Sequence, residues 1–517
     1  MLSIITSCAL SGIDAYPVTV EVDITSGLPG FTMVGLPDSA VKEARERVFA
    51  ALKNSGFTVP SKRITVNLAP GGIRKEGTAF DLPLALGILL ASEQVQAPPP
   101  TGLLFLGELS LDGTIRPVRG ILSAAIYAKE SGRDGLILPM ENRAEADQVE
   151  GLGIFAPANL IEALEFLRCP VFPKRLKPRR ISRDFLDNDD LDFADVRGQS
   201  GAKRALEVAA AGAHNFLLVG SPGCGKTLLA RRLPSILPML NEAENLETTR
   251  IYSVAGLLRP GQGAMQIRPF RSPHHSISQQ ALVGGGGWSR PGELSLAHNG
   301  VIFLDELPEF HKDAIESLRQ PLEEGSITIS RTSMSLTYPC RAILGSAMNP
   351  CPCGYLLDSK RRCLCRMEEI VRYRARLSGP LLDRIDIHLE LPTLGFGELE
   401  SAVKGESSGM IRSRVDMARK IQLLRFKKYP SSRGTEIFCN GHMTGIQARE
   451  FCILEAGARK LLRNAVETLG FSARAYDRIL KVGRTIADLE ACEEIREMHI
   501  AEAIHYRCLD REMQPFG

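Results

Sequence analysis

A glycine-rich segment in the middle of the chain has the residue types that hold a phosphate group. Residues 220–227 read GSPGCGKT, after an apolar run at 215–219 and before a helix-forming stretch at 228–233. Glycines let backbone N–H groups wrap phosphate oxygens at a helix N-terminus, and a lysine at this spacing reaches the β- and γ-phosphates of a nucleotide. An incidental glycine-rich turn is the alternative, which the strand–loop–helix order disfavours. The predicted nucleotide contacts are Gly220, Ser221, Pro222, Gly223, Cys224, Gly225, Lys226, Thr227 and Leu228.

A second apolar run, residues 301–304, ends in Asp305 and Glu306. A carboxylate at the carboxyl end of a strand is where a phosphate-loop fold places its Mg²⁺ partner, so we expect Asp305 and the Thr227 hydroxyl to hold Mg²⁺ beside ATP. Glu306 is the predicted base that orients the attacking water. A capping pair that opens the next helix is the alternative, and the phosphate loop makes it less favourable.

A third run, residues 341–346, precedes Asn349 and Pro350. An asparagine at the tip of the neighbouring strand can hydrogen-bond the γ-phosphate or the attacking water. Asparagine before proline is also a common turn, so only the order of the strands favours a catalytic role for Asn349.

Four of the twelve cysteines are clustered: Cys351, Cys353, Cys363 and Cys365. Two close pairs of thiols match a closed tetrahedral zinc site, which we expect to be structural and to staple an insertion next to Asn349. The C-x-C spacing is tighter than the usual C-x-x-C, so a disulfide or free thiols remain alternatives. The other cysteines are scattered, which fits reduced thiols better than a disulfide framework.

Composition bounds the class of protein. The chain has 517 residues, 63 Lys+Arg against 60 Asp+Glu, a net charge of +3 and 44% hydrophobic residues, which excludes disordered, collagen-like and coiled-coil classes. The near-neutral balance argues against a protein that coats a polyanion. No apolar run approaches the ~18 residues that cross a bilayer, and residues 1–20 resemble a strand more than a signal peptide. We therefore expect a cytoplasmic protein with no membrane partner.

Changes of composition divide the chain into four parts, and the fold class is α/β. Residues 1–168 alternate strand and helix signals and predict an α+β domain; proline and charge clusters at 169–192 predict a linker. Residues 193–392 predict a parallel-sheet core with the cysteine insertion at 351–365, and 393–517 predict an all-helical lid. Periodicity further predicts strands at 18–22 and 63–67, a hairpin at 326–338, and helices at 39–55, 81–93, 276–283, 413–426, 444–467, 476–489 and 498–509.

The motifs GSPGCGKT, VIFLDE (301–306), SAMNP (346–350) and SGPLLDRID (378–386) together resemble an AAA+ ATPase of the magnesium-chelatase-like branch. More narrowly, the chain resembles the ComM/YifB family of bacterial competence and branch-migration proteins over essentially its whole length, including DVRGQ at 195–199. The resemblance implies that Arg384 is an arginine finger for the γ-phosphate on a neighbouring subunit, and that Arg474 is the second sensor. Taken alone, both arginines fit surface salt bridges as well. An arginine finger needs a neighbour, so the resemblance implies a hexameric ring.

Two further segments match inserts of the magnesium-chelatase and MCM-helicase clade. One is the glycine run 284–287 with Trp288 and Arg290; the other is the hairpin that contains Arg331. In ring helicases of this clade both inserts face a central pore, so the resemblance makes Arg290 and Arg331 candidates for DNA phosphates and Trp288 a candidate for base stacking. A solvated hairpin arginine and a tryptophan packed under its loop remain the alternatives.

Residues 81–86 and 107–118 resemble the domain shared by Lon proteases and RadA. In proteolytic members a serine is activated by a lysine, and the resemblance places Ala79 and Leu122 at those two positions. It therefore implies an S5-domain-2-like α+β scaffold without peptidase activity, used for ring assembly or DNA binding.

The leading hypothesis is an ATP- and Mg²⁺-dependent ring motor that acts on branched or single-stranded DNA, a branch-migration helicase or translocase in recombination or natural transformation. No small-molecule substrate beyond ATP is expected. One alternative is a magnesium-chelatase ATPase subunit, from which the Lon-like domain and the cysteine insertion depart. A regulatory AAA+ scaffold and an ATP-dependent protease are the others, the latter disfavoured by Ala79 and Leu122.

Overall fold

The computed structural model describes residues 1–98, 100–173, 191–286, 290–331, 334–358, 360–393, 405–427 and 437–507. Contacts divide the chain into two compact units. The first unit holds Met1–Ile181, Asn241–Gln266 and Ser330–Tyr338, and the second holds the remainder. Both units are therefore built from segments that are separate in the sequence.

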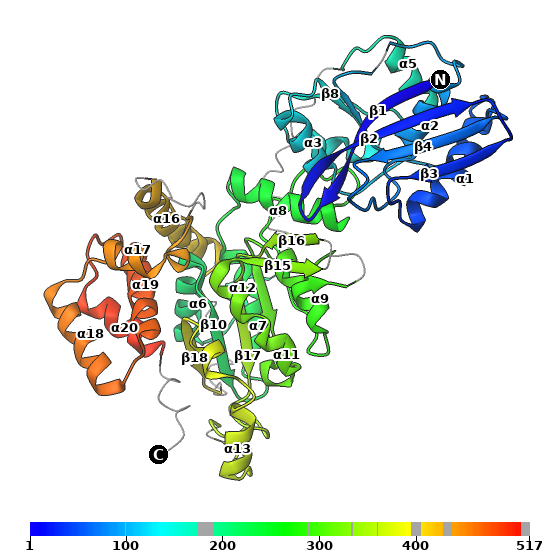
Figure 1. Ribbon diagram of the computed structural model, residues 1–517. Helices are drawn as coiled ribbons and strands as arrows, with labels where there is room; N and C mark the ends of the chain where they lie inside the picture. The colour runs from blue at the N-terminus through cyan, green and yellow to red at the C-terminus, as the bar shows by residue number, and fades with distance from the viewer. Residues whose placement is uncertain are drawn as a thin grey trace. The chain divides into compact units, whose positions relative to one another are not determined.

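The first unit contains a mixed four-stranded sheet, drawn in blue in Figure 1, in the order β1-β2-β4-β3. The β1–β2 and β2–β4 pairs are antiparallel and β3–β4 is parallel. A second, parallel sheet has the order β5-β8-β9. The elements are β1 (Leu2–Ser11), β2 (Asp14–Thr25), β3 (Gly30–Val34), α1 (Ser39–Asn54), β4 (Arg63–Ala69), α2 (Asp81–Ala91), β5 (Leu103–Phe105), α3 (Ile121–Glu130), β8 (Gly135–Ile137), β9 (Gly153–Phe155) and α5 (Leu160–Arg168). The α+β character predicted from periodicity is confirmed.

Helix α8 (Glu242–Ala255) belongs to the first unit although it follows the phosphate loop in the sequence. Leu246 packs against the apolar cluster formed by α3, β5 and β8. The Arg250 guanidinium donates to Asp14 Oδ1 at 2.6 Å, and Gly120 N donates to the carbonyl of Ser253 at 3.1 Å. The first unit is thus completed by a segment inserted in the ATPase sequence.

The second unit contains a five-stranded parallel sheet in the order β11-β14-β17-β10-β18. Alternate residues of a strand face opposite sides of a sheet. Phe216 and Leu218 of β10 therefore pack with α6 and α7, while Leu217 and Val219 pack with α9 and α11. The elements are α6 (Ser200–Gly212), β10 (Phe216–Gly220), α7 (Lys226–Ile236), β11 (Phe270–Arg271), α9 (Gln279–Val283), β14 (Val301–Leu304), α11 (Lys312–Glu316), β17 (Ile343–Met348), α13 (Met367–Arg374) and β18 (Ile387–Leu391).

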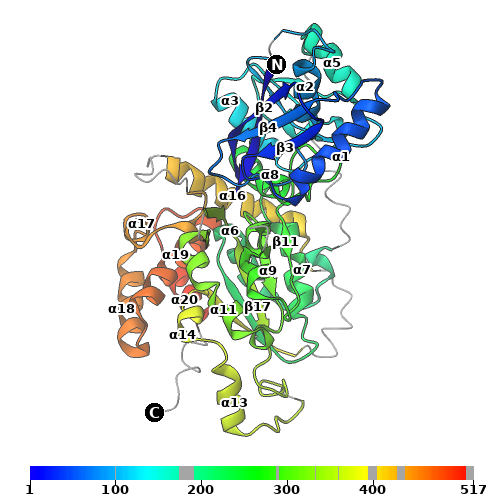
Figure 2. The ribbon, with the colours of Figure 1, turned by 45° about the vertical axis from the view of Figure 1, so that its right-hand side comes forward.

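The C-terminal part of the second unit is helical, as predicted. Figures 1 and 2 both show α17, α18, α19 and α20, coloured orange to red, gathered beside the sheet, with α19 in contact with α6. The elements are α16 (Ser408–Lys427), α17 (Gly445–Phe451), α18 (Ala456–Leu469), α19 (Ala473–Leu489) and α20 (Glu497–His505). The prediction of one amphipathic stretch at 444–467 is wrong in one respect: the stretch is two helices, because the intervening residue Leu454 forms a bridge with Ile495.

The predicted hairpin is present as β15 (Ser326–Arg331) and β16 (Met334–Pro339), which form a two-stranded sheet. The predicted helix at 276–283 is shorter, since α9 begins at Gln279, where Ser278 accepts a hydrogen bond from Ala281 N. Most of the predicted linker, residues 174–190, lies outside the described residues. Within the described ranges, no helix has both the length and the apolar character that a membrane span requires.

Candidate nucleotide site

The phosphate loop connects β10 to α7, as the sequence order predicts. Gly223 and Gly225 adopt φ values of +79° and +94°, a region that side chains with a Cβ rarely enter. No side chain caps the first turn of α7, so its backbone N–H groups are directed at the loop. Cys224 is buried against Gly220, and burial raises the pKa of its thiol. The loop therefore has the glycine geometry and the helix N-terminus that a polyphosphate requires.

Lys226 joins the phosphate loop to the tip of β17. Its ammonium donates to the carbonyls of Gly220 at 2.6 Å and Ser221 at 3.0 Å, and to Asn349 Oδ1 at 3.1 Å. Partial burial lowers the pKa of Lys226 below its ordinary value. The structure thus brings together the predicted phosphate-binding lysine and the asparagine that follows the third apolar strand.

Thr227 and Asp305 meet at the end of β14. The Thr227 hydroxyl donates to Asp305 Oδ2 at 2.6 Å, and Asp305 Oδ1 accepts from the backbone N–H of Glu306 at 3.0 Å. A hydroxyl and a carboxylate at this distance are oxygen ligands of the kind that Mg²⁺ takes beside a nucleotide. These two residues therefore fit the predicted metal.

Glu306 lies at the turn that follows Asp305. Its backbone has φ +53°, its side chain is exposed, and Glu306 Oε2 lies 3.7 Å from His275 Nδ1. Sequence reasoning did not single out His275, which follows the short strand β11 and has no spacing signal that connects it to Glu306. Leu228, predicted as a nucleotide contact, is 43% exposed in the first turn of α7.

Gln199 is another residue at the site for which the sequence predicted no role, although it ends the DVRGQ motif. Its side-chain amide donates to the carbonyls of Cys224 at 3.3 Å and Pro392 at 3.2 Å. It therefore ties the phosphate loop to the end of β18. The glutamine had no local signal for this contact, because its partners are far away in the sequence.

Arg384 does not lie beside Lys226. It precedes β18, and the parallel register pairs Ile387 with Phe216 and Leu391 with Gly220. At about 3.3 Å per residue the length of β10 separates the two ends of the sheet by roughly 13 Å. Arg384 is thus at the amino end of the sheet, while the phosphate loop is at the carboxyl end.

The side chain of Arg384 is buried and paired. It donates to Glu323 Oε1 at 2.6 Å and to the Pro380 carbonyl at 2.6 Å. Arg474 of α19 approaches the same Glu323 oxygen at 3.7 Å. The structure therefore brings the two predicted arginines to one carboxylate, and sequence reasoning missed that carboxylate.

Asp386 anchors the segment that contains Arg384. It forms a buried ion pair with Arg478 and accepts from the backbone N–H of Asn215 at 3.0 Å. Burial disfavours the charged carboxylate, but Arg478 and His214 outweigh burial and hold the pKa of Asp386 far below its ordinary value. The Asn215 side chain also donates to the Arg384 carbonyl at 3.0 Å, so the backbone at Arg384 is fixed to the start of β10.

The predicted cysteine cluster is assembled. Sγ–Sγ distances are 3.4 Å for Cys351–Cys353, 3.7 Å for Cys351–Cys363 and 3.6 Å for Cys353–Cys363, and the Cys365 sulfur accepts from Cys353 N at 3.4 Å. Four thiolates at ~2.3 Å from a tetrahedral Zn²⁺ lie about 3.8 Å apart, so these residues fit the metal. Gly354, which follows Cys353, packs so closely on the ring of Pro222 that a Cβ at this position would collide with the ring. The cluster is therefore adjacent to the phosphate loop.

The candidate DNA contacts are only partly described. Arg290 is exposed in β13 (Arg290–Pro291), which pairs with β12 (Gly284–Gly285). Ile329 of β15 packs over Gly284, so the two inserts share one apolar cluster. Arg331 ends β15 and its side chain is outside the described part, as is Trp288 altogether.

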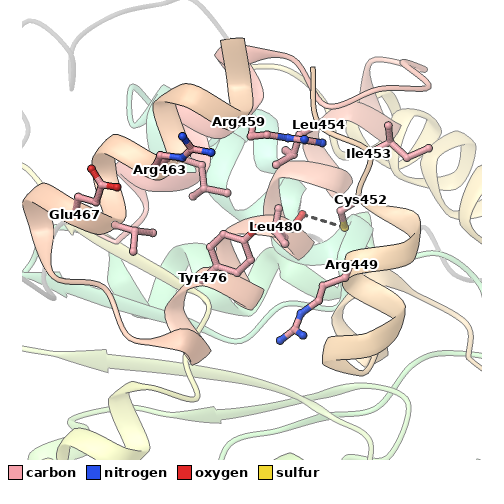
Figure 3. Close-up of a pocket in the computed structure, with 11 residues that line it drawn as sticks. Arg449, Cys452, Ile453, Leu454, Arg459, Arg463, Glu467, Tyr476 and Leu480 are labelled. Carbon is pink, nitrogen blue, oxygen red and sulfur yellow. Dashed lines mark hydrogen bonds between the residues drawn. The ribbon is translucent and has the colours of Figure 1, made fainter. Parts of the chain in front are cut away.

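Two other regions are distinct from the nucleotide site. In the first unit, Ala79 and Leu122 pack against one apolar cluster, and neither has a nucleophile or a base. The second unit has a cavity of about 530 Å³ between α17, α18 and α19, whose lining residues are drawn in Figure 3. It is lined by Arg449, Cys452, Ile453, Leu454, Arg459, Leu462, Arg463, Val466, Glu467, Tyr476 and Leu480, none of which is a predicted site residue.

Three family models match the chain. "Subunit ChlI of Mg-chelatase" matches residues 20–142, "Magnesium chelatase, subunit ChlI" matches 192–399, and "Magnesium chelatase, subunit ChlI C-terminal" matches 405–507.

The chain is also similar to curated proteins over its length. It is 44% identical to the protein YifB of Salmonella typhimurium over 512 residues, 99% of this chain and 98% of the relative. It is 43% identical to the Competence protein ComM of Haemophilus influenzae over 518 residues, 99% of both chains. A local similarity to Lon protease 2 of Bacillus subtilis reaches 31% over 128 residues, 25% of this chain and 23% of the relative. The chain therefore belongs to the ComM/YifB family of magnesium-chelatase ChlI-type AAA+ ATPases.

Proposed function

We propose that the chain is an ATP-hydrolysing ring motor that acts on DNA, a branch-migration helicase or translocase in recombination or natural transformation. The observation that carries the hydrolytic part is the meeting of Lys226 with Asn349 and of Thr227 with Asp305, at the ends of three adjacent parallel strands. The 43% identity to a relative named as a competence protein supports the DNA part, as do the two inserts with Arg290 and Arg331.

The residues divide the work of phosphoryl transfer. Lys226 binds the β- and γ-phosphates, and Thr227 and Asp305 hold Mg²⁺, which neutralises phosphate charge. Glu306 accepts the proton of the attacking water, and Asn349 orients that water or the γ-phosphate. Glu306 is suited to this task because its carboxylate is exposed to water.

The position of Arg384 supports a ring. Arg384 precedes β18 at the end of the sheet opposite the phosphate loop, and Arg474 contacts the same Glu323 carboxylate, which favours action of both on the ATP of another subunit. In the proposed ring they complete the site of the neighbouring subunit, where a guanidinium stabilises the charge that develops on the γ-phosphate.

The test is ATP turnover by the full chain without DNA and with single-stranded, duplex and four-way-junction DNA, together with displacement of a labelled strand from the junction. We expect stimulation of turnover, greatest with the junction, and strand displacement that depends on ATP. Equal turnover under all four conditions would remove the DNA part of the proposal.

A chelatase-type ATPase subunit is the second candidate, because the three matching family models all carry the ChlI description. The Lon-like first unit and the cysteine cluster have no evident use in that role. Binding to a chelatase partner subunit, with turnover that ignores DNA, would favour it. A non-proteolytic regulatory scaffold would show neither binding to that partner nor DNA stimulation.

A further inference from the structure

Three charged side chains from separate elements converge in the second unit. Glu323 lies in α12 (Arg319–Glu324), Arg384 follows α14 (Gly379–Leu382), and Arg474 lies in the first turn of α19. One oxygen, Glu323 Oε1, is 2.6 Å from Arg384 Nη2 and 3.7 Å from Arg474 Nη2. A single carboxylate oxygen therefore sets the distance between the two arginines.

The two arginines depend on Glu323 to different degrees. The Arg384 side chain is 9% exposed, its Nη1 donates to the Pro380 carbonyl, and Glu323 is the carboxylate that pairs with its Nη2, while its Nε has no hydrogen-bond partner in the described chain. The Arg474 side chain is 57% exposed, and Glu323 is its ion-pair partner. An exposed pair contributes little to stability, so the Arg474 contact is better explained by orientation than by folding.

Both helix ends carry the less favourable charge. A cation in the first turn of a helix and an anion in the last turn each oppose the helix dipole. Arg474 occupies the first turn of the 17-residue helix α19, and Glu323 is next to the last residue of α12. The two charges offset one another only when they are paired, which is expected of side chains selected for a task other than helix stability.

The backbones of both arginines are already fixed by other contacts. Asp386, two residues after Arg384, pairs with Arg478, one helical turn after Arg474 on the same face of α19. This ion pair sets the distance between the two segments but does not orient the guanidinium groups. The remaining freedom is in the two side chains; the Pro380 carbonyl holds one nitrogen of Arg384, and Glu323 is the group that contacts both guanidinium groups.

We propose that Glu323 is a positioning residue that holds Arg384 and Arg474 as a pair for the γ-phosphate bound to the neighbouring subunit. The inference rests on the proposed function, since it requires that the arginines act on a second subunit. Glu323 touches no nucleotide in this scheme. Its negative charge keeps the two guanidinium groups close together, whereas without it the two cations would repel each other.

The test mixes two full-length variants that are inactive by themselves. Lys226→Ala removes ATP binding but keeps the arginines, and Arg384→Ala keeps the phosphate loop but removes the finger. In a mixed ring, ATP bound to the phosphate loop of an Arg384→Ala chain can meet the arginines of a neighbouring Lys226→Ala chain. We expect turnover to be restored at those interfaces. Glu323→Gln is then placed either in the Lys226→Ala chain, which donates the arginines, or in the Arg384→Ala chain, which holds ATP.

We expect Glu323→Gln in the arginine donor to lower the restored kcat by about 10- to 100-fold, the cost of a misplaced catalytic group, without a matching rise in KM for ATP. The same substitution in the ATP-holding chain should leave the restored kcat unchanged. Equal effects in both chains, or a rise in kcat, would overturn the positioning role. No restored turnover with Glu323 intact in both chains would instead overturn the proposed ring, and the inference with it.

Two controls separate positioning from folding. Glu324→Gln changes the adjacent carboxylate, which accepts from Gln320 at 2.9 Å, and should not alter the restored kcat. Glu323→Asp keeps the charge and should recover part of the lost kcat. If Glu323→Gln lowers the melting temperature and the restored kcat of both Glu323 variants only follows their melting temperatures, the residue is structural and the inference is wrong.

Discussion

At the scale of single residues, Asp305 and Glu306 are neighbours in the sequence with different environments. Asp305 accepts hydrogen bonds from Thr227 and from the backbone, which hold its carboxylate in place. Glu306 has a left-handed backbone, an exposed side chain and His275 at 3.7 Å. The turn after β14 therefore gives the carboxylate that we expect to bind metal and the exposed carboxylate different surroundings.

This separation predicts different defects for two variants. Lys226→Ala should abolish both nucleotide binding and turnover, whereas Glu306→Gln should keep binding and lower kcat by about 10²–10⁴-fold, the range for loss of a general base. Binding of a fluorescent ATP analogue and steady-state turnover measure the two effects. Glu309→Gln is the matched control, because Glu309 is exposed and pairs with Arg376. Turnover by Glu306→Gln at the rate of Glu309→Gln would contradict the assignment.

At the scale of elements, contacts at opposite ends of the sheet place the site. At the carboxyl end, the turn after the first cysteine pair packs on Pro222 of the phosphate loop. At the amino end, Asp386 connects the start of β18 to α19 through Arg478, and Asn215 connects it to β10. These two connections join the helical C-terminal part and the cysteine insertion to the same sheet.

The first connection predicts that loss of the cysteine cluster weakens nucleotide binding. Cys363→Ser should lower the affinity for Zn²⁺ by at least about 10-fold and should also weaken binding of an ATP analogue, because the turn at Gly354 loses its support against Pro222. Metal content by mass spectrometry and analogue binding by fluorescence check this. The control is Cys169→Ser, which removes an exposed cysteine outside the cluster. Unchanged binding of the ATP analogue by metal-free Cys363→Ser protein would show that the cysteine cluster does not support nucleotide binding.

The second connection predicts a stability defect with a defined pH dependence. Asp386→Asn should lower the free energy of unfolding by about 3 kcal/mol at neutral pH, since it leaves the half-buried Arg478 without its partner. Because the folded-state pKa of Asp386 is depressed, its contribution is complete above the ordinary aspartate value of about 3.9 and is lost as the pH falls below it. Urea unfolding between pH 7 and pH 3 should therefore show the difference between wild type and variant shrinking in acid. Asp383→Asn serves as the control, and a difference that stays constant with pH would refute the ion pair.

At the scale of the whole molecule, the two units do not coincide with continuous stretches of sequence. The first unit takes α8 from the segment between α7 and β11. The link between the phosphate-loop helix α7 and α8 therefore runs from one unit into the other within residues 237–241. Only residues 237–241 lie between the end of α7 and α8 of the first unit.

This arrangement predicts that the first unit is incomplete without residues 241–266. A fragment of residues 1–181 should melt at a lower temperature than the same fragment with residues 241–266 attached through a flexible Gly/Ser linker, because Leu246 covers an apolar cluster and Arg250 pairs with Asp14. Circular dichroism against temperature checks the difference. Leu246→Ala in the extended fragment should remove most of the gain. Identical melting of the short and extended fragments would mean that α8 does not belong to this unit in solution.

The sequence alone determined the nucleotide loop, the carboxylates after β14, Asn349 and the cysteine pairs. These features lie close together in the sequence or directly follow an apolar strand, so local backbone geometry is enough to place them. Most strands and helices followed from periodicity for the same reason, whereas the break at Leu454 did not, because its cause is a bridge to Ile495.

Which distant groups meet depends on how the elements pack in the folded chain. Glu323 with its two arginines, His275 beside Glu306, Gln199 under the loop and α8 in the first unit all join residues far apart in the chain. Such contacts arise from the packing of helices on the sheet, and no periodicity in one segment specifies the partner in another.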